Sequence, residues 1–348
     1  MATIKEYLDY AELAQASYGL NLKEGMYNTY EYVDNKGTIR DILTDSSNKV
    51  NFSQAQAKNF SNRYEVLATS TQYGIGDLSS FDAVLFLDHD TGKKILAIRG
   101  SQEVTDYVVD AGLGISGLVY GQNVSLNNFY DALISDNKLS LTDKVDVTGH
   151  SLGGYLAQLF TASHSYAVDN AYTYNAPGIG GLNQELQELF GLKNQSDYND
   201  KITNLYAENG SEFVAGLGVM LGNIIPLSID PDAISANNHR IGKLTESLHI
   251  YDMLSSITQV QDVELLTSIL EHISNEKVID TIKNIFNSSI TGTNIDQCIE
   301  LAKNYKAKAT GITNLISKTQ TQLQDKTLAN LYALENLNPF VIEGDFEV

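Results

Sequence analysis

Cysteine is almost absent from this chain. Cys298 is the single cysteine among 348 residues, so no disulfide can form within the chain. A single cysteine is typical of proteins that stay in the cytosol, and it also suits exported bacterial proteins that fold without an oxidising system. The fold must therefore be held by packing and hydrogen bonds.

Basic residues are also few. Lys and Arg number 23 against 43 Asp and Glu, which gives a formal net charge of −20. Such a surface repels nucleic acids and anionic membranes at long range. Salt screens the repulsion and leaves short-range apolar contact with lipid open. The sequence shows no basic stripe, phosphate-binding glycine loop or cluster of metal ligands. We therefore expect no nucleic-acid partner, no cofactor and no metal.

Long hydrophobic runs are missing as well. Apolar residues make up 43% of the chain, which is enough for a sizeable core. The longest uncharged apolar stretch, residues 213–229, is interrupted by glycines and by Pro226. It therefore predicts a loop or lid and not a transmembrane segment. The N-terminal segment lacks a basic stretch followed by an apolar run, so no cleavable signal peptide is expected.

Short apolar runs alternate with helical patterns in the first two thirds of the chain. Runs with the length and composition of β-strands occupy residues 83–87, 94–98, 145–149, 171–175 and 202–207. Helical spacing covers residues 4–18, 124–138, 151–165 and 182–190. Turn residues between the first two runs indicate a β-hairpin. Strands that alternate with helices predict an α/β fold with a mostly parallel central sheet flanked by helices.

Two parts of the chain fall outside this pattern. Residues 21–80 are polar and predict no more than a short helix over 52–60. Residues 250–335 keep helical periodicity without a convincing strand. We therefore expect a sheet-containing domain over residues 1–255 and a helical C-terminal region over residues 256–348.

A G-x-S-x-G pattern lies at the end of the third expected strand. Gly149, Ser151 and Gly153 form it, with a strand before and a helix after. In this setting a serine sits on a tight, strained turn that tolerates only small neighbours, and its hydroxyl is lifted above the sheet. The backbone N–H of Leu152 then lies at a helix N-terminus, where it stabilises developing negative charge. The pattern predicts a nucleophilic serine with Leu152 as an oxyanion donor.

Two further segments resemble a known family. Residues 97–110, AIRGSQEVTDYVVD, are similar to the R-G-T-x-x-x-x-D-W-x-x-D segment of the class 3, fungal-type lipases, with Ser and Tyr in place of Thr and Trp. Residues 173–181, TYNAPGIGG, resemble the T-F-G-x-P-x-x-G segment of the same family. The resemblance covers roughly residues 5–255 and is strongest to bacterial secreted lipases and polyesterases. It implies an α/β-hydrolase fold and a second oxyanion donor at Ser101.

The resemblance also implies an activity. It points to a serine hydrolase that acts on carboxylic esters of lipids through an acyl-enzyme on Ser151. Lipases, phospholipases A1 and esterases use this machinery alike, so the ester itself stays open. An acyltransferase is a narrower variant, and a non-catalytic binding module of the hydrolase fold is the alternative from another class. A secreted bacterial protein exported without a cleaved N-terminal signal is expected, with the cytoplasm as the alternative location.

A serine nucleophile needs a histidine base, and the chain has six histidines. Order along the chain and local context leave His239 and His249. His249 is followed by Tyr251 and an apolar helical stretch, which is where the family commonly has its histidine. We therefore expect His249 to be the base, with His239 as the runner-up.

The acid that orients this base should follow the strand at residues 202–207. The family has D-I-V-P at this place, and Glu212-Phe-Val-Ala matches it with Glu in place of Asp. Glu208 lies nearer the strand, and Asp230 lies in a later segment. We expect Glu212 to be the acid, followed by Glu208 and then Asp230.

Two apolar segments with glycines, residues 111–121 and 213–229, flank the expected site in the sequence. They are either buried packing elements or the wall and lid of an acyl-chain groove, which long esters require. Because residues 213–229 directly follow Glu212, we expect part of this segment to line or cover the cleft.

Replacing Ser151 by Ala tests the nucleophile. The change removes a hydroxyl and little volume at a turn, so the fold should persist while the acyl-enzyme can no longer form. We expect ester hydrolysis and labelling by a fluorophosphonate probe to disappear together, with an unchanged melting temperature. More than a few per cent of residual activity, in a preparation free of wild type, would contradict the role of Ser151.

Overall fold

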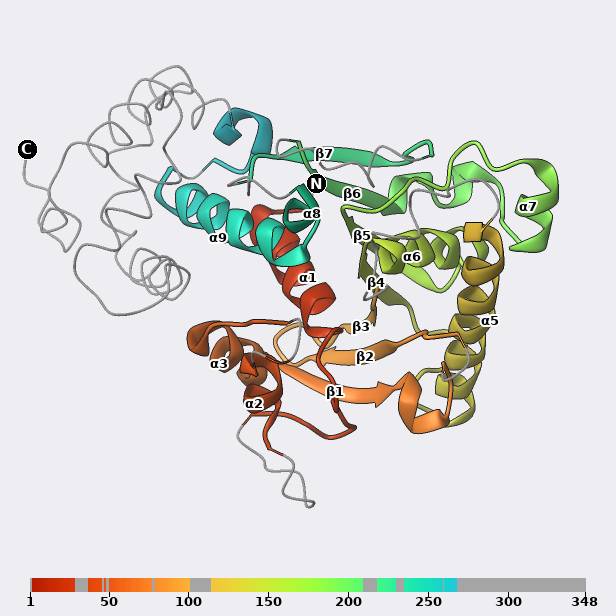
Figure 1. Cartoon of the computed structure of the whole chain (residues 1–348), viewed down its shortest axis with the longest axis horizontal. Coiled ribbons are helices and arrows are strands. Elements are labelled where there is room, and N and C mark those ends of the chain that lie inside the picture. The colour runs from red at the N-terminus through yellow and green to blue at the C-terminus, as the bar shows by residue number, and fades with distance from the viewer. Residues whose placement is uncertain are drawn as a thin grey trace, which may run out of the picture. The chain divides into compact units, whose positions relative to one another are not determined.

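The computed structural model describes residues 2–28, 37–45, 47, 50–76, 79–100, 114–208, 218–229, 235–258 and 260–267 (Figure 1). The chain forms two compact units. One runs from Asp9 to Thr245 and holds the sheet, and the other joins the residues up to Leu8 to the chain from Glu246 onward. None of the described helices combines the length and apolar character that crossing a membrane requires. Most of the expected C-terminal helical region lies outside the described residues.

Within the described residues, seven strands form one sheet in the order of the chain. They are β1 (Tyr64–Thr69), β2 (Ala83–Asp88), β3 (Lys94–Ile98), β4 (Val145–His150), β5 (Val168–Tyr174), β6 (Ile202–Ala207) and β7 (Asn223–Leu227). Strands β1 to β3 are antiparallel neighbours, and β3 to β7 run parallel. The five expected strands and the mostly parallel α/β sheet are therefore confirmed.

The two outermost strands escape the sequence pattern. Strand β1 lies in the polar segment 21–80, and β7 lies inside the apolar segment 213–229. Strand β7 pairs with β6, and Ile225 and Leu227 on it are buried. The expectation of a loop is therefore wrong for residues 223–227, because Ile225 and Leu227 pack in the sheet. The expectation that part of the segment lines or covers the cleft stays a prediction. Residues 209–217 lie outside the described residues.

Helices lie on both faces of this sheet (Figure 1). The described helices are α1 (Ile4–Ala16), α2 (Ile39–Thr44), α3 (Gln54–Arg63), α5 (Gly114–Ser135), α6 (Leu152–Ser163), α7 (Gln184–Leu189), α8 (Ser235–Asn238) and α9 (Ile241–Thr258), with short 3₁₀ turns at Ser70–Tyr73, Gln195–Asp197 and Asn199–Lys201. Helices α5 and α6 enclose the main core with one face of the sheet. On the other face the Tyr10 ring stacks on Tyr172 at 4.2 Å, and Phe60 meets Phe86 edge-on at 5.6 Å.

The main core follows the alternation of the strands. Alternate residues of β2 and β4 point toward α5 and α6 and are fully buried with residues of those helices: Ala83, Leu85, Val147, Leu126, Phe129, Leu156 and Phe160. Burying a large apolar side chain contributes roughly 1.5–3 kcal/mol. This core holds β4 and α6 rigidly on either side of the turn that joins them.

A buried carboxylate ties the Tyr10 segment of α1 to the sheet. Asp146, on β4, accepts hydrogen bonds from the Tyr10 hydroxyl, from Lys93 Nζ at 2.8 Å and from the backbone N–H of Asn170 at 3.0 Å. Its side chain is 1% exposed. A buried charge is tolerated when it is paired and hydrogen-bonded. Burial and the Asp146 charge raise the pKa of Tyr10, so its hydroxyl stays protonated and donates.

Replacing Asp146 by Asn should lower the free energy of unfolding by about 2 kcal/mol. The Asn amide N–H₂ group would face the buried groups that donate to Asp146, and neither side could accept. Asp169→Asn is the matched control, since Asp169 pairs with Lys144 through side chains that are 48% and 52% exposed. Such an exposed pair should contribute less than about 1 kcal/mol. Urea denaturation measures both values. Equal losses in the two variants would show that Asp146 does not anchor α1.

Candidate active site

Ser151 occupies the sharp turn between β4 and α6. Its φ and ψ are 58° and −126°, and this positive φ is one that residues with a side chain disfavour. The backbone N–H of Ser151 donates to the carbonyl oxygen of Tyr174, the last residue of β5, at 2.9 Å. The serine is therefore tied to the carboxyl ends of two neighbouring parallel strands.

Two glycines make this turn sterically possible. A Cβ atom on Gly149 would lie 2.4 Å from the carbonyl oxygen of Gly153, and one on Gly153 would lie 2.2 Å from that of Ile98 on β3. Non-bonded atoms do not approach so closely, so no side chain fits at either position. The strand–turn–helix geometry expected from the G-x-S-x-G pattern is present.

Of the two expected oxyanion donors, Leu152 lies within the described residues. Leu152 is the first residue of α6, and the first N–H groups of a helix have no acceptor within it and favour negative charge. Ser101 lies outside the described residues. The preceding Gly100 packs against the elbow, because a Cβ atom there would lie 2.5 Å from the His150 carbonyl oxygen and 3.3 Å from Ser151 Cβ. Gly100 therefore lies directly beside the nucleophile.

His150, the residue before the nucleophile, is buried in a polar network. Its Nδ1 lies 2.9 Å from the Tyr18 hydroxyl, and its Nε2 lies 2.6 Å from the carbonyl oxygen of His239. Because a carbonyl oxygen only accepts, Nε2 carries the proton and the Tyr18 hydroxyl donates to Nδ1. Burial lowers the pKa of His150 well below its usual value, and His239 beside it lowers the pKa further. The imidazole is therefore neutral.

His239 lies between α8 and α9, beside the same network. Asn175, which follows β5, donates from Nδ2 to the His239 carbonyl oxygen at 3.2 Å. The ring centroids of His150 and His239 are 4.8 Å apart. The structure thus brings the runner-up histidine next to the residue that precedes Ser151.

Of the other candidates for the base and the acid, the structure describes two. His249 is a buried residue of α9 and belongs to the second compact unit. Glu208 is exposed just after β6, and its backbone N–H donates to the Leu227 carbonyl oxygen at 3.0 Å. Glu212 and Asp230 lie outside the described residues. The choice of the acid stays a prediction.

Two residues of this buried network are not among the site residues expected from the sequence. Tyr18 ends the AELAQASY segment, and Asn175 lies inside TYNAPGIGG. Asn175 has a φ of 44°, a left-handed conformation that asparagine tolerates better than most residues. The conformation itself leaves no mark in a single sequence, so Asn175 could be found only within the segment 173–181 that the resemblance singles out.

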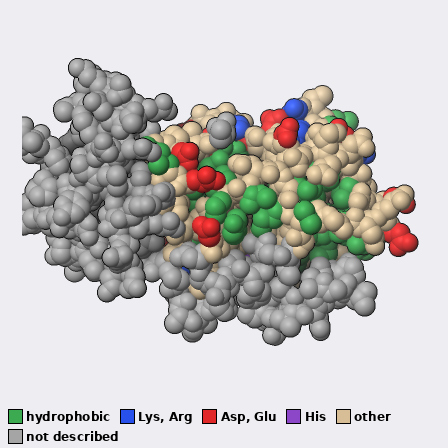
Figure 2. Space-filling view, turned by 90° about the horizontal axis from the view of Figure 1, so that it is seen from above, with side chains coloured by type: hydrophobic (Ala, Val, Ile, Leu, Met, Phe, Trp, Pro, Cys, Tyr) green, Lys and Arg blue, Asp and Glu red, His purple; other side chains and the backbone are tan. Residues whose placement is uncertain are grey.

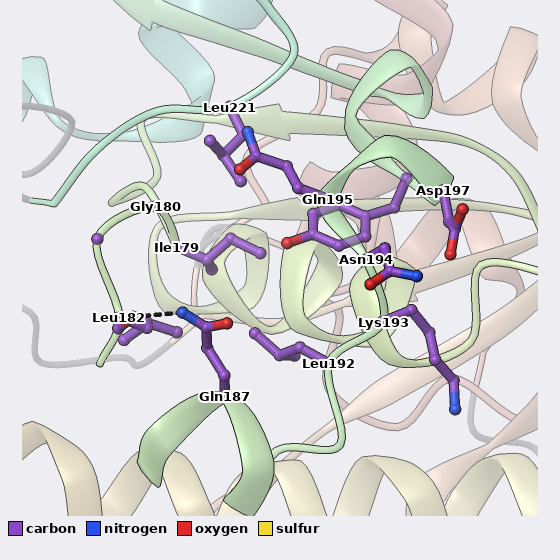
Figure 3. Close-up of a pocket in the computed structure, with 12 residues that line it drawn as sticks. Ile179, Gly180, Leu182, Gln187, Leu192, Lys193, Asn194, Gln195, Asp197 and Leu221 are labelled. Atoms are coloured by element: carbon purple, nitrogen blue, oxygen red, sulfur yellow. Dashed lines mark hydrogen bonds between the residues drawn. The ribbon is translucent and has the colours of Figure 1, made fainter. Parts of the chain in front are cut away.

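A cavity of about 520 Å³ lies elsewhere on the sheet-containing unit (Figure 3). Its lining includes Gln195 and Tyr198, which precede β6, and Leu221, which precedes β7. In Figure 3 the Gln187 side chain reaches across to the Leu182 carbonyl oxygen, with an Nε2–O distance of 2.6 Å. Ile179 to Leu182, which follow β5, also line the cavity. Ser151, His150 and His239 are not among its lining residues, so this cavity is not the candidate active site.

The fold and the turn define a class of protein. A mostly parallel sheet, a nucleophile-type turn after a central strand and a helix N-terminus behind the serine are the features of an α/β-hydrolase. Among the residues that the structure describes, no group of three or more His, Cys, Asp or Glu could hold a metal ion.

Comparisons with known proteins show which proteins the chain is similar to. The chain is similar to Lip2 lipase of Yarrowia lipolytica, with 18% identity over 65% of this chain and 78% of that one, and a TM-score of 0.39. It is also similar to a Rhizomucor miehei lipase–propeptide complex, with 16% identity over 65% and 67% and a TM-score of 0.41. No curated protein matches significantly. Residues 42–210 match the model of the Tle-like phospholipase domain, a phospholipase-like family.

Residues 42–210 are thus similar to a phospholipase-like domain. This match supports a lipid ester hydrolase with a class 3 lipase-type fold. It agrees with the resemblance drawn from residues 97–110 and 173–181.

Replacing His150 by Gln should flatten the pH dependence of stability in mild acid. The lowered pKa keeps this imidazole neutral in the folded chain, whereas in the unfolded chain it takes up a proton below pH about 6.5. Its contribution to stability is therefore complete above pH about 6.5 and is lost as the pH falls further, by up to about 1.4 kcal/mol per pH unit. Urea denaturation of both proteins between neutral and mildly acidic pH measures the two slopes. Identical slopes would contradict a buried neutral His150.

Proposed function

We propose that the chain hydrolyses carboxylic esters of lipids through an acyl-enzyme on Ser151. The observation that carries the proposal is the turn at Ser151, where a strained serine lies at the N-terminus of α6 beside buried histidines. The Tle-like phospholipase match over residues 42–210 supports a lipid ester as the substrate.

The reaction follows from this arrangement. The Oγ atom of Ser151 attacks the ester carbonyl carbon while a histidine takes its proton. The N–H of Leu152 and a donor from Ser101 hold the oxyanion of the tetrahedral intermediate. The protonated histidine then gives its proton to the leaving alcohol, and the acyl group remains on Ser151. Water, deprotonated by the same histidine, attacks the acyl carbonyl carbon. The bond to Ser151 Oγ then breaks, the histidine returns the proton to Oγ, and the fatty acid is released.

The geometry supports His239 as this base. Its carbonyl oxygen accepts hydrogen bonds from His150, which directly precedes Ser151, and from Asn175, which follows β5. His249 stays the candidate that the family resemblance implies. For the acid, Glu212 stays first, with Glu208 and Asp230 as alternatives. The acid would fix the imidazole tautomer and stabilise its positive form during the reaction.

The described surface favours uncharged or zwitterionic lipids. Figure 2 shows hydrophobic side chains gathered on the side of β7, with acidic side chains among them and few basic ones. Val219 and Ile224 are large hydrophobic side chains that are exposed by 56% and 44%. Together with a net charge of −20, this composition permits apolar contact and disfavours anionic lipid at low salt.

The alanine variants His239→Ala and His249→Ala decide the base. Loss of the base should lower the rate by about three orders of magnitude, because the catalytic groups act as a unit. We expect this for His239→Ala, on short p-nitrophenyl esters and on phosphatidylcholine vesicles, and a much smaller change for His249→Ala.

The opposite result would make His249 the base. Melting temperatures of both variants separate lost catalysis from lost folding. A wild-type chain that neither takes up a fluorophosphonate on Ser151 nor releases fatty acid from vesicles would instead be a non-catalytic binding module. Transfer of the acyl group to an added alcohol in preference to water would indicate an acyltransferase.

A further inference from the structure

The carbonyl oxygen of His239 receives two hydrogen bonds from buried side chains. His150 donates from Nε2 at 2.6 Å, and Asn175 donates from Nδ2 at 3.2 Å. His150 ends β4 and Asn175 follows β5, so the donors come from two adjacent strands. The backbone at His239 is therefore attached to the two strands that also hold Ser151.

The orientation of the Asn175 amide follows from its other contacts. Its Oδ1 accepts from the backbone N–H of Ala207, at the end of β6, at 2.8 Å, which turns Nδ2 toward His239. The backbone N–H of Asn175 donates to the Leu205 carbonyl oxygen at 2.9 Å. Asn175 is completely buried. The donor that reaches His239 thus has one orientation that satisfies both ends of the amide.

The orientation of the His150 ring is determined in the same way. The backbone N–H of Gly100 bonds the Tyr18 oxygen, and the Tyr18 hydroxyl donates to His150 Nδ1 at 2.9 Å. Nε2 of His150 then donates to His239. Three successive hydrogen bonds therefore connect Gly100, which precedes the expected oxyanion residue Ser101, to the backbone of His239.

We propose that His150 and Asn175 are positioning residues that hold the His239 backbone, and through it the base, at Ser151, with Tyr18 fixing the His150 ring. The inference rests on the proposed role of His239. A base must be held to within a fraction of an ångström of its working position, and a displacement of about 1 Å lowers the rate by about 100-fold. A neutral His150 also places no second positive charge beside His239 when that ring takes the serine proton.

A pair of substitutions at position 150 tests the proposal. His150→Leu removes both ring nitrogens, whereas His150→Gln keeps an N–H donor near the place of Nε2. We expect His150→Leu to lower kcat on p-nitrophenyl acetate by about 100-fold with KM within a few-fold of wild type. His150→Gln should recover most of the loss. His164→Leu is the matched control and should leave kcat near wild type. His164 is a part-buried histidine directly after α6, and its Nδ1 contacts the Ser163 hydroxyl at 2.8 Å.

Tyr18→Phe provides a variant that removes a single oxygen and should fold even if His150→Leu does not. It leaves the ring in place and takes away the donor to His150 Nδ1, so kcat should fall by about 10-fold without a change in KM. Wild-type kcat in Tyr18→Phe and His150→Leu would overturn the proposal. Equal losses in His150→Leu and His150→Gln that follow their melting temperatures would also overturn it and leave a structural role.

The double variant His150→Leu/His239→Ala separates this inference from the proposed function. If His150 acts through His239, adding His150→Leu to His239→Ala should not slow the residual labelling of Ser151 by a fluorophosphonate any further. A full additional loss would refute the positioning role and leave His239 as the base. Wild-type activity in His239→Ala alone would instead refute the proposed base.

Discussion

The backbone at Ser151 is the constraint on which the rest of the site depends. A φ of 58° is disfavoured for a residue with a side chain and costs of order 1–3 kcal/mol unless its surroundings enforce it. Here β3, β4 and α6 pack so closely that side chains are excluded at Gly100, Gly149 and Gly153. The position of the hydroxyl is therefore set by the packing of the whole sheet and not by the local sequence alone.

Parallel strands explain why residues far apart in the chain meet at this point. Strands β3 to β6 all end at the same edge of the sheet. That edge collects Gly100 after β3, Ser151 after β4, Asn175 after β5 and Glu208 after β6. Each strand contributes through a residue just after its end, and the backbone N–H groups of Ser151, Asn175 and Glu208 still bond to the neighbouring strand. The candidate active site therefore forms along this edge of the sheet, and each strand supplies only part of it.

The central strands and the nucleophile could be predicted because their signals are local. Strands buried on both faces read as continuous apolar runs, and the small residues around Ser151 follow from steric exclusion. The edge strands could not be predicted in this way. Strand β1, YEVLAT, carries a charge and borders polar sequence, and β7, NIIPL, contains a proline inside a longer apolar segment. The choice between His239 and His249 depends on which loop returns to the end of β4. Single-sequence periodicity does not encode that tertiary contact.

The buried polar network explains how a flexible chain can present a histidine with little freedom. Tyr18, His150 and Asn175 occupy positions where apolar side chains would pack without any need for partners. In a low-dielectric interior an unpaired member of such a network is costly, so the arrangement that satisfies all three is strongly favoured over its alternatives. That arrangement requires the carbonyl oxygen of His239 as the final acceptor. The strain at Ser151 fixes the nucleophile, and the hydrogen-bond requirements of its buried neighbours fix the backbone of the proposed base relative to it.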